Sequence, residues 1–368
     1  MQTHRSQSGC HLPRTRSIAT SIAWLVVVVS TLVNMSSSIS ADNPGEFLLF
    51  PDVTAFARSG DPAARGLKKS NINPAADLFY SIDRGSFRFL SEYLVDKDAH
   101  DLERFQLGVR LGEPTLWLGR FHNPIGYWNT QFHHGAYLQT SASRPGIVAF
   151  EGGDGPLPMH LTGLLLEGVK EVRSAGLHYT WAAGLGPKLK EELQPFDLLH
   201  RDSSHRFGTT LRLSYQPVSY ALDEVGVSLS YTNIPADNLE IRRVRQTVAA
   251  LFGNWQLGPV RGLGEILYVH DNIDLLSARS NKSFVSAYAQ LEWLLDQKWT
   301  VFSRIENTFA SNEDPYLDRF DRTVRKRALI GARYNIRRNM AIKLEVSRDK
   351  LETARFNQIT LQWSAVFP

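Results

Sequence analysis

Pairs of arginines recur inside segments in which apolar and polar residues alternate. Two of these segments are "RFQLGVRL", with Arg104 and Arg110, and "RFGTTLRLSY", with Arg206 and Arg212. Within each pair the spacing is even, so both side chains lie on one face of an extended chain. Rings or ladders of guanidinium groups attract anions. The complete set of candidate anion-attracting residues is Arg88, Arg104, Arg110, Arg206, Arg212, Arg325, Arg327 and Arg333.

The residues between these arginines indicate which element carries them. In the first segment Phe105, Leu107 and Val109 share the face opposite the arginines, and "FVSAYAQLEWLL" later in the chain repeats the pattern. A strict period of two is typical of β-strands whose faces meet different environments. If the apolar face meets lipid, the arginines line a polar interior. The alternative is that these arginines only pair with acidic residues across that interior.

Such segments recur from about residue 47 to the end of the chain, with short and long connections alternating between them. Short turns at one end and long loops at the other are typical of transmembrane barrels. We therefore predict an all-β, antiparallel, up-and-down transmembrane β-barrel of about sixteen strands, with fourteen as the alternative. The predicted strands are 47–58, 75–82, 86–96, 102–111, 115–122, 160–169, 173–185, 205–216, 222–233, 244–256, 260–271, 283–295, 298–310, 323–336, 339–348 and 356–367.

The start of the chain predicts a cleaved secretory signal peptide over residues 1–40, with the barrel occupying 41–368. Arg14 and Arg16 precede an apolar run from Ile18 to Val33, and small residues follow it. The alternative is a single membrane anchor. Cleavage removes Cys10, the only cysteine, and lowers the formal net charge of +4 by three. The high pI is therefore no signal for a nucleic-acid partner, and the exported chain has no thiol chemistry.

Three stretches resemble bacterial outer-membrane porins, especially the porin-like superfamily that includes the phosphate-selective porins. They are "ADLFYSIDRGSFRFLSEYLV", "TLWLGRFHNPIGYWN" and the closing "ITLQWSAVF". The resemblance covers nearly the whole mature chain and implies a bacterial outer-membrane barrel, inserted by the barrel-assembly machinery, embedded in outer-membrane lipid and usually homotrimeric. The chain differs from the porin pattern at its end. Porin-type chains generally end on an aromatic residue, whereas here Pro368 follows Phe367.

Residues 122–159 form the longest predicted connection. Its aromatic residues, glycines and prolines predict a loop folded into the barrel, and a solvated cap outside the barrel is the alternative. The segment from 122 to 160 also contains four histidines, which are common metal ligands. No ligand spacing recurs among them, so we predict no metal site and no cofactor. These histidines are His122, His133, His134 and His160.

These features predict a channel for passive diffusion of small hydrophilic solutes, with a modest anion preference. A closed barrel that acts in binding, adhesion or as a scaffold is the alternative, and a soluble β-sandwich ranks third. Small residues on the polar faces favour an open interior. No enzyme is predicted, because Ser204 beside His205 lacks a nucleophile elbow and placeable partners. The small residues are Gly108, Gly208, Gly226, Ser228 and Ser230.

Overall fold

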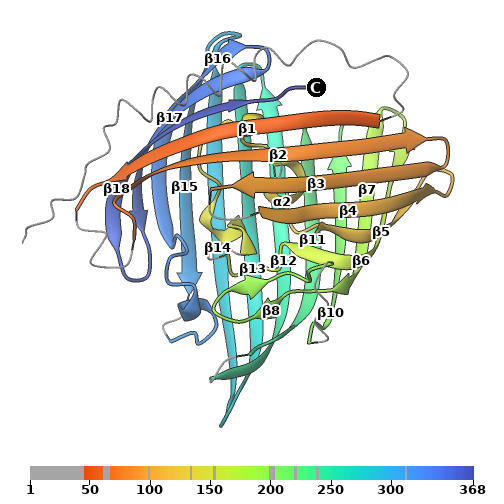
Figure 1. The fold of residues 1–368 in the computed structure, drawn as a ribbon, viewed down its shortest axis with the longest axis vertical. Helices are drawn as coiled ribbons and strands as arrows, with labels where there is room; N and C mark the ends of the chain where they lie inside the picture. The colour runs from red at the N-terminus through yellow and green to blue at the C-terminus, as the bar shows by residue number, and fades with distance from the viewer. Residues whose placement is uncertain are drawn as a thin grey trace, which may run out of the picture. The chain divides into compact units, whose positions relative to one another are not determined.

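The protein forms a closed antiparallel β-barrel in a computed structural model that describes residues 45–60, 67–97, 100–132, 135–151, 155–198, 204–218, 222–237, 240–310 and 313–368 (Figure 1). The predicted signal peptide lies outside the described residues. Within the described part of the chain, the barrel strands are β1 (Gly45–Arg58), β2 (Ser70–Arg84), β3 (Phe87–Asp96), β4 (His100–Arg110), β5 (Thr115–His122), β6 (His160–Val172), β7 (Ala175–Leu185), β10 (Phe207–Gln216), β11 (Glu224–Pro235), β12 (Ile241–Leu257), β13 (Val260–Leu275), β14 (Arg279–Leu294), β15 (Trp299–Ala310), β16 (Lys326–Arg337), β17 (Met340–Lys350) and β18 (Arg355–Ala365).

The barrel closes where its last strand pairs with its first. β18 runs antiparallel to β1 from the pair Asp52 and Ser364 to the pair Arg58 and Gln358. Beyond this ladder, Leu49 and Phe367 exchange two backbone hydrogen bonds of 2.8 and 2.9 Å. Every barrel strand among the described residues therefore has two neighbours, and the barrel sheet has no unpaired edge there. The predicted closed barrel of sixteen strands is confirmed.

The connections differ between the two ends of the barrel. β2 and β3, β6 and β7, and β16 and β17 are joined by tight turns, whereas the connections after β5, β7 and β15 are long. The long connections hold short elements of their own. These are α2 (Trp128–Gln131), η2 (Ala136–Leu138) and η3 (Gly146–Val148) after β5, β8 (Lys188–Leu189) and β9 (Leu193–Gln194) after β7, and η5 (Leu317–Arg319) after β15.

The outer face of the barrel is apolar, as the alternating pattern predicts. Leu107 on β4, Leu211 on β10 and Trp293 on β14 are 44 %, 46 % and 57 % exposed, while the polar residues between them point inward and are mostly buried. A continuous apolar exterior around a polar interior is the arrangement that suits a barrel in lipid. No helix among the described residues has the length and apolar character to cross a membrane.

Small residues on the inner face do not open onto water, contrary to the expectation from sequence. A Cβ added to Gly108 would lie 2.5 Å from the indole ring of Trp117, and one added to Gly226 would lie 2.5 Å from the ring of Phe252. The side chain of Ser228 accepts a hydrogen bond from a backbone amide of the long loop. These positions are small because neighbouring rings and the loop occupy the space in front of them.

Candidate functional site: a loop and a cavity inside the barrel

The connection between β5 and β6 crosses the interior and is held by side chains of the opposite wall. The backbone amide of Trp128 donates a 2.6 Å hydrogen bond to Glu265 on β13. Further along, the amide of Gly146 donates a 2.7 Å bond to Glu306 on β15. Near the middle, the amide of Gly135 donates a 3.0 Å bond to Asp77 on β2. The loop is therefore attached to strands on both sides of the barrel.

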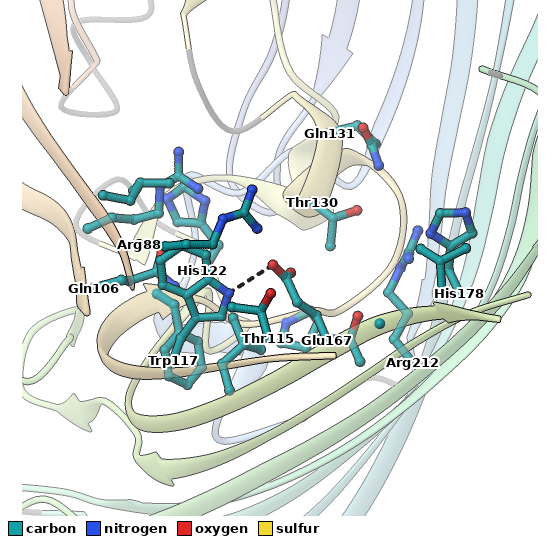
Figure 2. Close-up of a pocket in the computed structure, with 18 of the residues that line it drawn as sticks. Arg88, Gln106, Thr115, Trp117, His122, Thr130, Gln131, Glu167, His178 and Arg212 are labelled. Atoms are coloured by element: carbon teal, nitrogen blue, oxygen red, sulfur yellow. Dashed lines mark hydrogen bonds between the residues drawn. The ribbon is translucent and has the colours of Figure 1, made fainter. Parts of the chain in front are cut away.

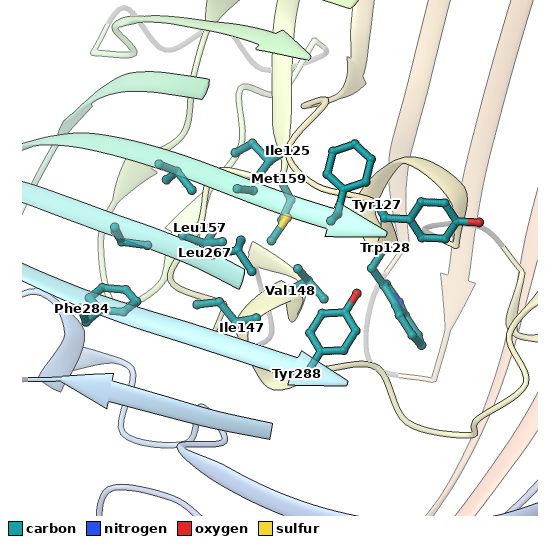
Figure 3. Close-up of a cluster of buried hydrophobic side chains, with 14 of the residues drawn as sticks. Ile125, Tyr127, Trp128, Ile147, Val148, Leu157, Met159, Leu267, Phe284 and Tyr288 are labelled. Atoms are coloured by element: carbon teal, nitrogen blue, oxygen red, sulfur yellow. The ribbon is translucent and has the colours of Figure 1, made fainter. Parts of the chain in front are cut away.

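Apolar packing adds to these hydrogen bonds on one side of the barrel. The inner faces of β12, β13 and β14 present apolar side chains, against which buried residues of the loop pack (Figure 3). Burial of this kind stabilises by about 1.5–3 kcal/mol for each large side chain. The cluster comprises Ile125, Tyr127, Trp128, Ile147, Val148, Leu157 and Met159 of the loop region, Val248, Ala250, Phe252, Leu263, Leu267, Val269, Phe284 and Tyr288 of the wall, and Leu317 of η5.

Arg304 on β15 is the most heavily bonded anchor of the loop. It donates to Glu306 at 2.8 Å and to the hydroxyl of Ser141 at 2.9 Å, and it also bonds Ser143. On β17, Glu345 accepts hydrogen bonds from the amide of Ser143 and from the preceding amide. Because these charged groups are buried, their hydrogen bonds offset the cost of removing them from water.

A cavity of about 540 Å³ remains beside the loop, on the side of β3 to β7. Figure 2 shows wall residues around it, with Thr130 and Gln131 of α2 on the loop side. Two of the lining side chains are bonded to each other, because the indole of Trp117 donates a 2.8 Å hydrogen bond to Glu167. The charged and titratable side chains lining the cavity are Arg88, Arg104, Glu113, His122, Glu167, His178 and Arg212.

Each arginine that lines this cavity also pairs with an acid. Arg104 donates a 3.0 Å bond to Glu92, and Arg88 lies 2.9 Å from Asp83. Arg212 pairs with Glu224 while its Nε donates to the carbonyl of Gly126 in the loop. Acids therefore neutralise Arg88, Arg104 and Arg212, but they do so from neighbouring strands of the same wall and not across the interior, as the alternative expected. The cavity nevertheless carries three guanidinium groups against the carboxylates of Glu113 and Glu167.

The other predicted arginines lie elsewhere. Arg327 pairs with Glu306 and Asp349 and lines a second cavity of about 360 Å³. Arg206 is exposed and lines a separate pocket. The rest line neither loop-side cavity: Arg110 pairs with Asp83, Arg325 with Glu352, and Arg333 donates to the carbonyls of Tyr137 and Gln139.

Arg144 is a loop residue that the sequence did not single out. It lines the second cavity with Arg58, Arg322 and Arg327, and its guanidinium lies 3.7 Å from the ring centroid of Phe150. Burial lowers the pKa of Arg144 to about 10, so it remains charged at neutral pH. No pattern around Arg144 distinguishes it in the sequence, because the other arginines of this cavity belong to segments distant in sequence.

The histidines of the long loop separate into two groups. His133 and His134 lie outside the described residues. His122 and His160 are buried and face one another across the β5–β6 ladder, with ring centroids 5.1 Å apart. His205, considered beside Ser204 as a catalytic pair, donates through Nδ1 to the carbonyl of Gly186 at 2.8 Å. The absence of an enzymatic activity stays a prediction.

The strands that pack against the loop have a sequence feature that a search for strict alternation misses. On β12 and β13, "VAALF" (248–252) and "EILYV" (265–269) are nearly continuous apolar runs. A strand that is apolar on both faces is typically covered on both faces. Val248, Ala250 and Leu267 face the loop, whereas Leu251 and Ile266 are exposed outside.

The comparisons with known proteins place this architecture among solved barrels. No protein-family model and no curated protein matches the chain. The outer-membrane channel DcaP of Acinetobacter baumannii has a TM-score of 0.56 and 11 % identity, covering 90 % of this chain and 100 % of its own. Salmonella typhi OmpF, in complex with daunomycin, has a TM-score of 0.58 and 10 % identity, with the same coverage. A trimer form of Vibrio cholerae OmpT has a TM-score of 0.54 and 9 % identity, covering 88 % of this chain and 99 % of its own.

At these identities the similarity shows the fold alone. The chain shares the closed, sixteen-stranded architecture of outer-membrane porins over nearly the entire length of each neighbour. The phosphate-selective type that the sequence resemblance named receives no support from these neighbours.

Proposed function

We propose that the protein is a porin-like channel of the bacterial outer membrane through which small hydrophilic solutes diffuse passively. The cavity beside the loop is the observation that carries this proposal. Its volume of about 540 Å³ can hold small hydrated solutes, and charged and polar side chains from β3 to β7 are part of its lining. Solutes of this kind pass most readily where water and polar side chains replace lost hydration.

The loop at 122–159 is the constriction of the channel. Its hydrogen bonds to Asp77, Glu265 and Glu306 extend it across the interior, and its apolar residues hold it against β12 to β14. The open path is thereby confined to the side of the barrel on which the cavity lies. A constriction anchored on rigid strands keeps a defined width, since its anchoring side chains are bonded, with Glu265 and Glu306 buried and Asp77 half-buried.

A modest anion preference is part of the proposal, because Arg88, Arg104 and Arg212 line that path. Each of these arginines is paired with an acid, and Glu113 and Glu167 line the same cavity, so the proposed preference is weak. The phosphate-selective type of the family resemblance stays a prediction. Inorganic phosphate therefore belongs among the tested solutes, together with chloride.

The outer-membrane location and a homotrimeric assembly are part of the proposal. The apolar exterior suits lipid, and the structural neighbours include outer-membrane proteins and a trimer form of one of them. Insertion by the barrel-assembly machinery follows from that location. Crosslinking of the detergent-extracted protein should give a three-chain species, and a single-chain band at every crosslinker concentration contradicts the trimer.

A closed barrel with a binding, adhesion or scaffold role is the second candidate. The observation that favours it is the apolar cluster of loop and wall, because Trp128, Val148 and Leu157 are fully buried inside the barrel. A plug of this kind needs no solute path. If the barrel is closed in this way, the protein should insert into lipid bilayers without producing an ionic current.

Planar-bilayer recording distinguishes the two candidates. The refolded protein should give stepwise conductance, and under a potassium chloride gradient the reversal potential should have the sign of mild chloride preference. Insertion without conductance supports the closed barrel. Conductance with a cation preference rejects the anion assignment while leaving the channel intact.

A further inference from the structure

Three buried side chains bring metal-ligand atoms together where the long loop leaves and rejoins the wall. Glu103 on β4, His122 at the end of β5 and His160 at the start of β6 each offer one ligand atom, and these atoms lie within 4.8 Å of one another. All three side chains are buried. Two imidazole nitrogens and one carboxylate oxygen form a ligand set typical of zinc sites with an open fourth position.

The chain reaches this arrangement through two local features. His122 and His160 are far apart in sequence but are directly paired in the antiparallel ladder of β5 and β6. Glu103 is the extra residue of a β-bulge, because β4 pairs Arg104 with Glu92 and Leu102 with Tyr93. A bulge re-aims a side chain that regular alternation would place on the other face.

The loop itself supplies a positioning partner for His160. Nδ1 of this ring donates a 2.8 Å hydrogen bond to Glu151, and the same carboxylate accepts from the backbone amide of Met159 at 2.8 Å. With Nδ1 committed, Nε2 faces Glu103 at 2.8 Å. A carboxylate behind a histidine is the arrangement that fixes the tautomer and orientation of metal-binding imidazoles.

The charges around the cluster favour a cation. Glu103 and Glu151 contact His160, while Glu92 lies 3.9 Å from His122 and is bonded to Arg104. When an ion occupies the site, both imidazoles are neutral and Glu92 is paired with Arg104, so the carboxylates of Glu103 and Glu151 offset the charge of the ion. The buried guanidinium of Arg144 is a further charge that interacts with Glu103. A metal ion at Nε2 would replace the proton that otherwise holds His160 against Glu103.

We propose that Glu103, His122 and His160 bind a divalent transition-metal ion, with Glu151 as the positioning residue. Zinc bonds to nitrogen and oxygen are about 2.0–2.2 Å, which places the ligand atoms of a tetrahedral site about 3.4 Å apart. Binding therefore draws together the ligand atoms that lie up to 4.8 Å apart, and it slightly separates Nε2 of His160 from Glu103, which are 2.8 Å apart. The ion reaches the site through the loop-side cavity, which His122 also lines. Its binding fastens both ends of the constriction loop to β4.

Cobalt(II) titration of the full chain in detergent tests this site. One equivalent of Co²⁺ should give visible absorption bands of a low-coordinate nitrogen and oxygen site, and Zn²⁺ should abolish them. Glu103→Gln and His122→Asn should each weaken Zn²⁺ binding at least tenfold, and Glu151→Gln about 10- to 100-fold. The glutamine substitutions keep side-chain volume, and heat-modifiable migration on gels verifies that each variant is folded.

Two controls restrict the result to this site. His270→Gln changes a histidine whose Nδ1 contacts Ser283 on the neighbouring strand, and binding should be unchanged. The double variant His133→Ala, His134→Ala removes the adjacent loop histidines and should retain the one-equivalent spectrum. The proposal is overturned if folded Glu103→Gln and His122→Asn bind Zn²⁺ as tightly as the parent chain, or if the double variant alone loses the spectrum.

Discussion

The inner walls of β3 to β5 and of β12 to β14 face the same interior but have different surfaces. On β3 and β4 the buried side chains include Glu92 and Gln106, and a cavity lies in front of Arg88 and Arg104. On β12 to β14 the corresponding inner positions include Val248 and other apolar residues, and the loop packs directly on them. We call the first surface the wet wall, because a cavity borders it, and the second the dry wall, because the loop covers it. The wet wall also carries a smaller apolar cluster that includes Trp117 and Phe121.

The difference explains how a loop can constrict a barrel without closing all of it. Apolar contact has no preferred direction and gains free energy from every contact that excludes water. The loop therefore lies against the dry wall, where Leu267 and Phe284 are buried. Against the wet wall, desolvating Arg88 and Arg104 would cost more than apolar contact returns.

Removing part of the loop should abolish the difference between the two walls. We expect it to have the largest effect on conductance and stability. Deletion of residues 141–157 takes away much of the cover of the dry wall, including Ile147, Val148 and Leu157. Single-channel conductance should increase several-fold, because the path would no longer be confined to one side. The barrel should also unfold at a lower denaturant concentration, since apolar inner side chains become wet. A folded deletion variant with unchanged conductance would show that the loop does not restrict the path.

Truncating a leucine on each wall sharpens the comparison. Leu267→Ala on the dry wall should lower the free energy of unfolding by about 2–5 kcal/mol, because the buried site cannot collapse fully around the lost atoms. Leu90→Ala should cost clearly less, since Leu90 is only half-buried and lines the cavity on one side, although it packs against the apolar cluster of Trp117 and Phe121 on the other. Guanidinium unfolding of the detergent-solubilised barrel measures both. Equal costs would contradict the distinction between the walls.

A methyl group added next to the dry cluster should have an intermediate effect. Gly226→Ala places a Cβ 2.5 Å from the Phe252 ring and 2.6 Å from the carbonyl of Leu213, so the cost should be about 1–3 kcal/mol. Gly253→Ala is the matched control, because the nearest atom to its added Cβ is 3.7 Å away. The same unfolding measurement separates them. If the two variants are equally stable, Phe252 is not tightly packed.

A charge change on the wet wall should have the smallest effect. Arg88→Gln removes one of three cavity guanidinium groups and should shift the reversal potential in a salt gradient modestly toward cations. Arg348→Gln, at an exposed position of β17, should leave it unchanged. A shift of equal size in both variants would place the selectivity outside the cavity.

The strands and the outer face could be predicted from the sequence because both follow a period of two. Every predicted strand corresponds to a barrel strand, and segments such as 105–111 expose the apolar set that the pattern assigned to lipid. The dry wall could not be predicted in this way. Val248 and Leu267 belong to runs that are apolar on both faces, so alternation contains no information about which face the loop covers.

The site could be predicted only in part. Arg88, Arg104 and Arg212 lie in stretches that alternate regularly, with Arg104 directly after the bulge of β4, so the alternating pattern could assign them to the inner face. All three line the cavity. The orientation of the Glu103 side chain could not be predicted, because a bulge interrupts the alternation of inward and outward residues at this position. The pairing of His122 with His160 depends on strand register, which no spacing along the chain reveals.

The seam between β1 and β18 joins residues 52–58 to residues 358–364. Bringing together two segments this far apart in sequence lowers the entropy of the chain before their contacts form. Strand pairings between such distant segments therefore form slowly. Until this seam forms, both terminal strands are open edges that can pair with another chain. Closure of this seam is therefore a step exposed to aggregation, and substitutions along the seam should reduce the yield of refolded barrel more than the stability of barrels already closed.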